Sequence, residues 1–306
     1  MKKHFSVAVL GGDKRQESIA EYFAINGVNV FIWGVELHIE NENLFRCTTW
    51  QEALHNSQAV VLPLPVSDDD IHLRMSENLQ NSTIRLDAIL QQIQPTQLVF
   101  GGLLSARFSE KLKENSISFF DYFNSETVQL KNALLTAEGA ILLGMQALPV
   151  SIDQSHFAVI GYGRIGELLA KRLIALGATV TVYARREDAL TRASFERCQV
   201  QRLSIEDDYA SLKGIDRETV VVYNTVPEII FTANRLECFP QSTLFIELAS
   251  FPGGIDRAVA KQKGIPILHG NSLPGKYAPK SAGYVLAESI KSMLIQYPTT
   301  KQYFME

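Results

Sequence analysis

Three glycines with the spacing Gly-x-Gly-x-x-Gly lie near the middle of the chain, directly after an apolar run over residues 157–160. They are Gly161, Gly163 and Gly166. In a dinucleotide-binding unit the apolar run forms a buried parallel strand, and the first glycine makes a tight turn. The second glycine lets the backbone approach a pyrophosphate, and the third lets the next helix pack on the strand. The pyrophosphate then lies at the N-terminus of that helix, so the spacing predicts a dinucleotide site.

The residues after these glycines have the pattern of a helix and a second strand. From Arg164 onward, apolar residues recur at the spacing of one helix face. They are Ile165, Leu168, Leu169, Leu173 and Leu176. Gly177 then supplies a left-handed cap, and an apolar strand resumes over residues 180–183. The glycine spacing alone is a weak signal, but this context completes a strand-helix-strand unit and supports the dinucleotide prediction.

The end of that second strand predicts which dinucleotide is bound. An NAD enzyme normally has Asp or Glu about twenty residues past the glycines, where the acid binds the ribose 2′-hydroxyl and would repel a 2′-phosphate. Here the strand ends in Ala184, Arg185 and Arg186. Guanidinium groups suit phosphate, so we expect NADP. The alternative is that both arginines lie on a solvated strand end.

Two later apolar strands also end in turns that we expect to bind the cofactor. The turns contain Asn224, Thr225, Val226 and Pro227, and Leu248, Ala249 and Ser250. In doubly wound sheets the carboxyl ends of the strands line the ligand crevice, so Asn224, Thr225 and Ser250 are predicted near the nicotinamide ribose. Ordinary turn chemistry is the alternative.

Composition bounds the class of protein. With 306 residues, of which 46% are hydrophobic and 20% charged, the chain suits two soluble domains with separate cores. A net charge of −4 argues against a general nucleic-acid binder, which needs a basic face. The cysteines and histidines are scattered, so neither a disulfide framework nor a metal site is indicated. We expect no signal peptide and no membrane span, and hence a cytoplasmic protein.

The first half of the chain repeats the pattern of the second. A strand over residues 7–10 leads into the turn Gly11-Gly12-Asp13 and a helix over residues 15–25, and further strand cores follow. This half also predicts an open parallel sheet. Its turn lacks the full glycine spacing, so we expect it to bind substrate and not a second dinucleotide.

A helix is predicted to connect the halves. Small and apolar residues share one helical face over residues 136–148, and Glu138 lies off that face. The predicted organisation is an N-terminal substrate domain over residues 1–130, the connecting helix over 131–150, a nucleotide-binding Rossmann domain over 151–280, and a C-terminal helix over 281–306.

With these turns assigned, the chain resembles the family of dipicolinate synthase A subunits. The segments that carry the resemblance occur in order along nearly the whole chain. They are Ala8 to Gln16, Thr136 to Gly139, Gly161 to Gly166, Asn224 to Pro227, Leu248 to Ser250 with Pro252-Gly253-Gly254, Leu273 to Gly275, and Ala278 to Gly283. The first and the last of these are the most distinctive. Two residues depart from the family pattern, since Phe251 replaces its usual Arg and Leu135 its usual Pro.

This resemblance implies an architecture and an activity. The architecture is two Rossmann-like doubly wound domains separated by a cleft, with the last helix returning to the N-terminal domain. The activity is formation of dipicolinate from a dihydrodipicolinate precursor of the lysine pathway, together with a flavoprotein-like B subunit. The implied setting is the mother cell of a sporulating bacterium, and a homo-oligomer is expected.

A cyclic dicarboxylate that is being aromatised requires cations, a hydride acceptor and an acid or base. Our hypothesis is that Arg15 and Lys280 bind the carboxylates and that Glu138 transfers a proton, with His269 as the alternative. Each of these residues also has an ordinary structural explanation, such as capping or solvating a helix end. The substrate residues are predicted to be Gly12, Asp13, Arg15, Thr136, Pro279, Lys280 and Ser281.

Two other functions remain open from the sequence. One is a related amino-acid or 2-hydroxyacid dehydrogenase, which would turn over pyruvate or glyoxylate with NAD(P)H. The other is a non-catalytic NADP-binding protein that organises a flavoprotein partner. Tight NADP binding without any oxidation or reduction of the cofactor would favour that second function.

Overall fold

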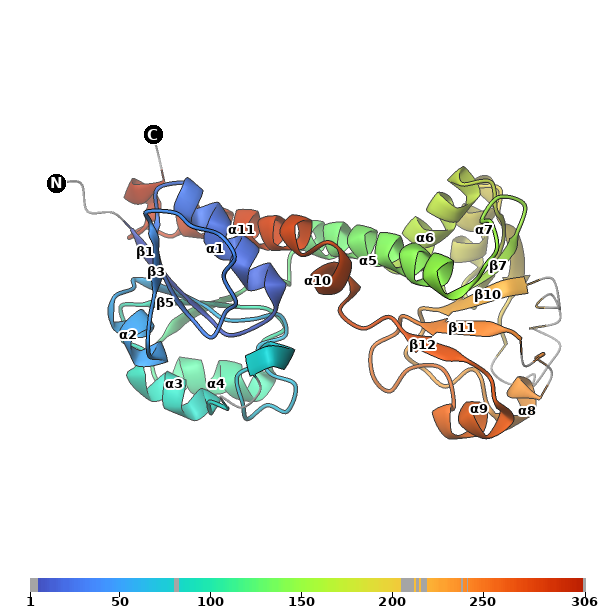
Figure 1. Ribbon diagram of the computed structural model, residues 1–306, viewed down its shortest axis with the longest axis horizontal. Helices are drawn as coiled ribbons and strands as arrows, with labels where there is room; N and C mark the ends of the chain where they lie inside the picture. The colour runs from blue at the N-terminus through green and yellow to red at the C-terminus, as the bar shows by residue number, and fades with distance from the viewer. Residues whose placement is uncertain are drawn as a thin grey trace. The chain divides into compact units, whose positions relative to one another are not determined.

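The computed structural model describes residues 5–79, 83–204, 212, 215, 219–237, 239–240 and 242–304. The chain forms two compact units. Unit 1 consists of Met1–Asn132 and Pro274–Glu306, and unit 2 consists of Ala133–Leu273. Each unit contains one six-stranded parallel sheet with flanking helices (Figure 1), which confirms the predicted pair of Rossmann-like doubly wound domains.

The sheet of unit 1 has the strand order β3-β2-β1-β4-β5-β6. Its strands are β1 (Ser6–Leu10), β2 (Asn29–Trp33), β3 (Leu44–Arg46), β4 (Ala59–Val61), β5 (Leu98–Gly101) and β6 (Ser118–Asp121). Its helices are α1 (Lys14–Ile25), α2 (Trp50–His55), α3 (Leu86–Gln92), α4 (Ala106–Glu114), α10 (Leu273–Tyr277) and α11 (Pro279–Gln296), with short 3-10 turns at Glu77–Leu79 and Lys301–Tyr303.

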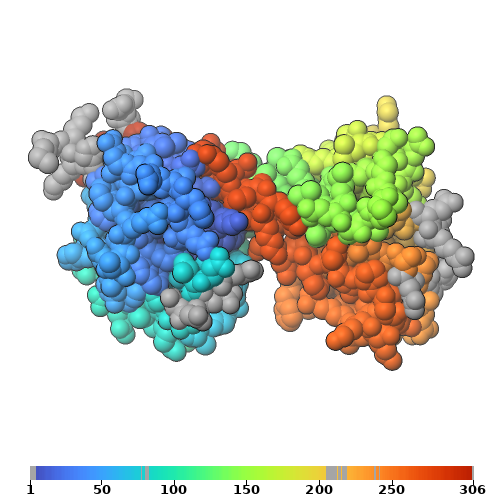
Figure 2. All heavy atoms as spheres, viewed as in Figure 1, coloured from blue at the N-terminus to red at the C-terminus, as the bar shows by residue number. Residues whose placement is uncertain are grey.

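The helices of unit 1 cover both faces of its sheet. Helices α1 and α11 lie on one face, and α2, α3 and α4 lie on the other (Figure 1). The return of α11 to the N-terminal domain is therefore confirmed, and its residues lie against those of α1 on the surface of unit 1 (Figure 2). The two helices approach closely at Gly283 because glycine has no side chain. A Cβ there would lie 2.5 Å from the carbonyl oxygen of Arg15.

The sheet of unit 2 has the strand order β12-β11-β10-β7-β8-β9. Its strands are β7 (His156–Ile160), β8 (Thr179–Ala184), β9 (Gln199–Arg202), β10 (Thr219–Asn224), β11 (Leu244–Glu247) and β12 (Ile267–His269). Its helices are α6 (Arg164–Ala175), α7 (Glu187–Phe195), α8 (Ala233–Leu236) and α9 (Arg257–Lys263). Helices α6 and α7 pack on one face of the sheet, and α8 and α9 pack on the other.

Helix α5 (Glu126–Ala147) connects the two units and is longer than the sequence pattern predicts. The apolar stripe is clear only from residue 136 onward, yet the helix begins ten residues earlier than that. Val128 and Ala133 are buried in this first part, among Leu, Lys and Gln residues that favour helix. Local propensity and burial of these residues therefore extend the helix.

Both sheets reverse their strand order at one point, β1 with β4 in unit 1 and β7 with β10 in unit 2. In open α/β sheets a ligand binds at this switch point, outside the carboxyl ends of the strands. The turn after β1 and the turn after β7 are therefore the equivalent positions to compare. Among the described residues no helix is long and apolar enough to cross a membrane.

Candidate functional site

The glycine turn after β7 requires glycine at two positions for packing reasons. Gly161 has a φ of +90°, and a Cβ there would lie 2.4 Å from Thr225 Oγ1. A Cβ on Gly166 would lie 2.2 Å from the carbonyl oxygen of Gly161. The first and third glycines thus make the tight turn and the close approach of helix to strand, as the spacing predicts.

Gly163 differs from these two glycines because it faces open space. It is the exposed N-cap of α6, it has no side-chain cap hydrogen bond, and no heavy atom lies within 4 Å of the position of a Cβ. The first N–H groups of a helix have no acceptor inside the helix. An open turn at the start of a 12-residue helix therefore has the space and the donors that a pyrophosphate needs.

The end of β8 presents the two arginines beside carboxylates of the same unit. Ala184 is buried, Arg185 Nη1 lies 2.8 Å from Glu228 Oε2, and Arg186 donates to both oxygens of Asp188 at 2.8 and 2.7 Å. All four charged side chains are about half exposed or more, so these ion pairs hold the guanidinium groups weakly. A 2′-phosphate can therefore compete for them.

The turn after β10 is held by side-chain hydrogen bonds. Asn224 is fully buried, and its Nδ2 donates to the carbonyl of Val226 at 2.9 Å and to Glu247 Oε1 at 2.7 Å. Thr225 Oγ1 donates to the carbonyl of Ile160 at 2.8 Å, which ties this turn to β7. Both amide hydrogens of Asn224 are thus used within the protein, so Asn224 shapes the turn.

The turn after β11 depends on a residue that the sequence assignments omit. Glu247 is 2% exposed, and its oxygens accept from the backbone N–H of Ala249 at 3.2 Å and of Gly254 at 2.8 Å as well as from Asn224. Leu248 is buried and Ser250 is exposed. An acidic residue that ends an otherwise apolar strand was the signal in the sequence.

The turn after β1 in unit 1 is closed by the chain itself. Gly12 is buried and its N–H donates to the carbonyl of Arg74 at 2.8 Å. The carboxylate of Asp13 caps α1 by accepting from the backbone N–H of Arg15 at 3.0 Å. The Arg15 guanidinium then binds both oxygens of Asp13 at 2.8 and 2.7 Å. A carboxylate of the protein thus lies where a phosphate would bind.

The charges at this turn stabilise each other. Burial alone would raise the pKa of Asp13, but hydrogen bonds and charge from Arg15 outweigh it and hold the pKa below its ordinary value. Arg15 is 5% exposed and also donates to the carbonyl of Leu64 at 2.5 Å. Arg74, which the sequence assignments omit, donates to the same carbonyl at 3.2 Å. Two guanidinium groups therefore converge on one backbone oxygen.

The structure places the predicted residues of α11 along α1. Pro279 occupies the first turn of α11. Lys280 is 67% exposed, and its Nζ lies 3.0 Å from Glu21 Oε1. Gly275, just before α11, approaches the Asp13 carboxylate, because a Cβ there would lie 2.9 Å from Asp13 Oδ2. Ser281 is exposed. Within unit 1, Asp13 and Arg15 are thus brought together, while Lys280 pairs with a different acid.

The two predicted residues on α5 differ in exposure. Thr136 is buried, at 6% exposure. Glu138 is 54% exposed, and its Oε1 lies 3.6 Å from Arg172 Nε of α6. Glu138 is therefore accessible to solvent and has a cationic neighbour.

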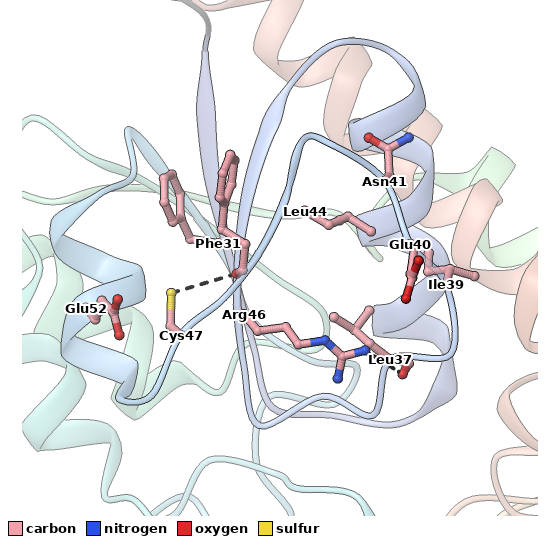
Figure 3. Close-up of a pocket in the computed structure, with 10 residues that line it drawn as sticks. Phe31, Leu37, Ile39, Glu40, Asn41, Leu44, Arg46, Cys47 and Glu52 are labelled. Carbon is pink, nitrogen blue, oxygen red and sulfur yellow. Dashed lines mark hydrogen bonds between the residues drawn. The ribbon is translucent and has the colours of Figure 1, made fainter.

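A groove of about 510 Å³ lies at the β3 edge of unit 1 (Figure 3). Apolar side chains such as Leu37, Leu44 and Phe31 line it together with Arg46 and Cys47. Arg46 donates to the carbonyl of Leu37 at 2.9 Å, and burial raises the pKa of Cys47. The groove contains none of the predicted site residues, so we do not place the site there.

Comparison with known proteins agrees with this geometry. Residues 6–123 match the model of the N-terminal domain of the dipicolinate synthase A subunit. The A subunit of dipicolinate synthase from Bacillus subtilis is 26% identical over 291 residues, which are 95% of this chain and 96% of the relative. The chain is similar to dipicolinate synthase A subunits along almost its whole length.

Solved structures of dipicolinate synthase A subunits extend the similarity to the fold. The protein from Bacillus halodurans has a TM-score of 0.79 and 27% identity, with 96% of this chain and 98% of that chain covered. The protein from Bacillus subtilis has a TM-score of 0.78 and 26% identity, with 97% of each chain covered. The resemblance read from the sequence is thereby confirmed.

Residues 138–249 match the NAD-binding domain of D-isomer specific 2-hydroxyacid dehydrogenases. The match includes the open glycine turn and the turn after β10. Together with the likeness to dipicolinate synthase A subunits, it supports an oxidoreductase with a nicotinamide dinucleotide as its cofactor. The glycine spacing predicted this cofactor class correctly.

Proposed function

We propose that this chain is an NADP-dependent oxidoreductase of dipicolinate synthesis. The observation that carries the proposal is the turn after β7, where Gly163 faces open space at the start of α6 and two arginines follow the end of β8. Gly161, Gly163 and the first turn of α6, with Arg164 and Ile165, would hold the pyrophosphate. Arg185 and Arg186 would hold the 2′-phosphate.

The bound cofactor would supply hydride transfer, which aromatisation of a dihydro ring requires. The role of this chain's residues is to bind and orient the cofactor. The turns after β10 and β11 would enclose its nicotinamide ribose, with Thr225, Val226 and Pro227 on one side and Leu248, Ala249 and Ser250 on the other.

The substrate in this proposal is a cyclic dicarboxylate derived from dihydrodipicolinate. The turn after β1 and the start of α11 would bind it through Gly12, Asp13, Arg15, Pro279, Lys280 and Ser281, together with Thr136 of α5. Arg15 and Lys280 would face its carboxylates, and Glu138 would transfer a proton. A flavoprotein-like B subunit would complete the synthase in the mother cell of a sporulating bacterium.

Cofactor preference is tested by removing both arginines after β8. In Arg185→Ala/Arg186→Ala we expect NADP⁺ to bind about 30-fold more weakly, because two charge-assisted contacts to the 2′-phosphate are lost, while NAD⁺ affinity changes by less than about twofold. Calorimetric titration with each cofactor measures this. Lys263→Ala, which removes a cation paired with Glu237 elsewhere in unit 2, is the control. Equal losses for NADP⁺ and NAD⁺ would contradict the assignment.

The reaction itself is tested with the dihydrodipicolinate-pathway intermediate, NADP⁺ and the flavoprotein-like partner, by following the ultraviolet absorption of dipicolinate. We expect dipicolinate to form only when the cofactor is present. Failure to form dipicolinate with any cofactor would overturn the proposal.

A rate-versus-pH profile that is unchanged in Glu138→Gln would remove Glu138 as the acid or base.

A second candidate function follows from the match of residues 138–249 to 2-hydroxyacid dehydrogenases. A related dehydrogenase would reduce glyoxylate or pyruvate with NADPH or NADH. Turnover of either 2-oxo acid, without any dipicolinate formation, would favour that function over the synthase.

A further inference from the structure

Glu247 is a buried carboxylate at the carboxyl edge of the sheet of unit 2, and the proposed function gives it no role. It is the last residue of β11 and is 2% exposed. Strand β11 lies between β10 and β12 (Figure 1), and in the sheet register Glu247 pairs with Asn224, the last residue of β10, and His269, the last residue of β12. Glu247 therefore occupies the centre of the three strand ends that follow the switch point.

The two oxygens of Glu247 bind two different turns. Oε1 accepts from Asn224 Nδ2 at 2.7 Å and from the N–H of Ala249 at 3.2 Å, and Oε2 accepts from the N–H of Gly254 at 2.8 Å. Asn224 Nδ2 also donates to the carbonyl of Val226 at 2.9 Å. One carboxylate thus connects the turn over residues 225–227 to the turn over residues 248–254.

The second turn wraps closely around this carboxylate. A Cβ on Gly253, whose φ is +84°, would lie 3.0 Å from Glu247 Oε2, and a Cβ on Gly254 would lie 2.3 Å from Asn224 Nδ2. Three neutral donors compensate the buried charge of Glu247. Burial of a carboxylate costs free energy, so packing alone would favour an apolar side chain here. A carboxylate accepts from both turns at once, which an apolar side chain cannot do.

We propose that Glu247 is a positioning residue for the nicotinamide-ribose half of the cofactor. By accepting from both turns it fixes the backbone after β10 relative to the backbone after β11, where ligands bind in α/β sheets. This inference rests on the proposed cofactor. The adenosine half of the cofactor would bind at the glycine turn and at the arginines after β8. Glu247 contacts neither of these.

The test compares two ligands in Glu247→Gln. Glutamine keeps the shape, but its amide nitrogen is a donor and would face one of the donors that Glu247 accepts. We expect NADP⁺ to bind about tenfold more weakly, because one turn is released. Binding of 2′,5′-ADP, which lacks the nicotinamide and its ribose, should change by less than about twofold. Calorimetric titration of both ligands measures the difference.

Glu237→Gln is the matched control, because Glu237 belongs to the same unit but is 65% exposed and pairs with Lys263. It should leave both affinities unchanged. If Glu247→Gln does not fold, Asn224→Ala takes its place. That variant removes one donor and leaves Glu247 its two backbone donors, so we expect a smaller loss that is again confined to NADP⁺.

Three results would overturn the role of Glu247: equal weakening of both ligands, no weakening of either, or wild-type affinity for NADP⁺ no greater than for 2′,5′-ADP. The first would mean that Glu247 only stabilises the unit. A wild-type protein that binds neither ligand would instead overturn the NADP assignment, and the role of Glu247 with it.

Discussion

The turns after β1 and after β7 occupy equivalent positions in two sheets of the same topology, yet their helix N-termini differ. Gly163 leaves the start of α6 open and exposed. At the start of α1 the carboxylate of Asp13 caps the helix and Arg15 neutralises that carboxylate. One fold thus provides an open, uncapped helix terminus in unit 2 and a self-compensated terminus in unit 1.

The difference follows from a few residues and not from the topology. An N-cap glycine adds no side chain, so the helix donors remain available to a ligand. An N-cap aspartate uses the same donors within the protein. The role of a strand-helix turn in a doubly wound sheet must therefore be judged from the residues at and after the N-cap.

The largest effect is expected from Gly166→Ala in unit 2. The added methyl group would lie 2.2 Å from the carbonyl oxygen of Gly161, and backbone has little freedom to move there. We expect the free energy of unfolding of this unit to fall by about 2–3 kcal/mol. Urea denaturation of the protein without cofactor measures it.

Gly163→Ala is the matched control for Gly166→Ala. Gly163 has a φ of −86° and open space at the Cβ position, so the cost should be only about 1 kcal/mol or less, from replacing a favoured N-cap residue by alanine. Similar losses in the two variants would mean that the turn is not packed as described.

A smaller effect is expected from Arg15→Met in unit 1. The side chain of Arg15 is 6% exposed, and its loss leaves the Asp13 carboxylate without its cation. We expect a loss of about 2 kcal/mol in the free energy of unfolding, with NADP⁺ affinity unchanged. Arg186→Met removes an ion pair of the same bidentate form from an exposed site in unit 2. The thermal midpoint of Arg186→Met should not change. An equal drop in the thermal midpoints of Arg15→Met and Arg186→Met would contradict the contrast between the two sites.

The smallest effect is expected in acid. The pKa of Asp13 is lower in the folded protein than its ordinary value of 3.8. Its ionised form therefore stabilises unit 1 above that pH, and the contribution is lost as the pH falls through the lowered pKa. The stability difference between the wild type and Asp13→Asn should shrink below about pH 4. Unfolding curves at several pH values would show this, and a constant difference would argue against the ion pair.

Much of the fold was predictable from the sequence because buried parallel strands are continuous apolar runs and the glycine turns have fixed spacing. The dinucleotide turn was predictable for the same reason. The partners of charged residues were not, because pairs such as Lys280 with Glu21 join residues far apart in the chain. Glu247 was missed because its role depends on two turns that meet only in the folded sheet.

The start of α5 was also missed, since its first ten residues lack a single apolar stripe and are helical through propensity and burial. The roles predicted for Arg15, Lys280 and Glu138 stay predictions. Their ion pairs are now known, and any substrate must compete with those partners.

The most direct test of the central claim is to convert the turn of unit 2 into that of unit 1 with Gly163→Asp. The backbone there suits any residue, and aspartate is a favoured N-cap, so the thermal midpoint should be unchanged or higher. Its carboxylate would occupy the helix terminus and repel the pyrophosphate, so NADP⁺ should bind at least about 100-fold more weakly in a calorimetric titration. A folded Gly163→Asp protein with wild-type affinity for NADP⁺ would contradict the account.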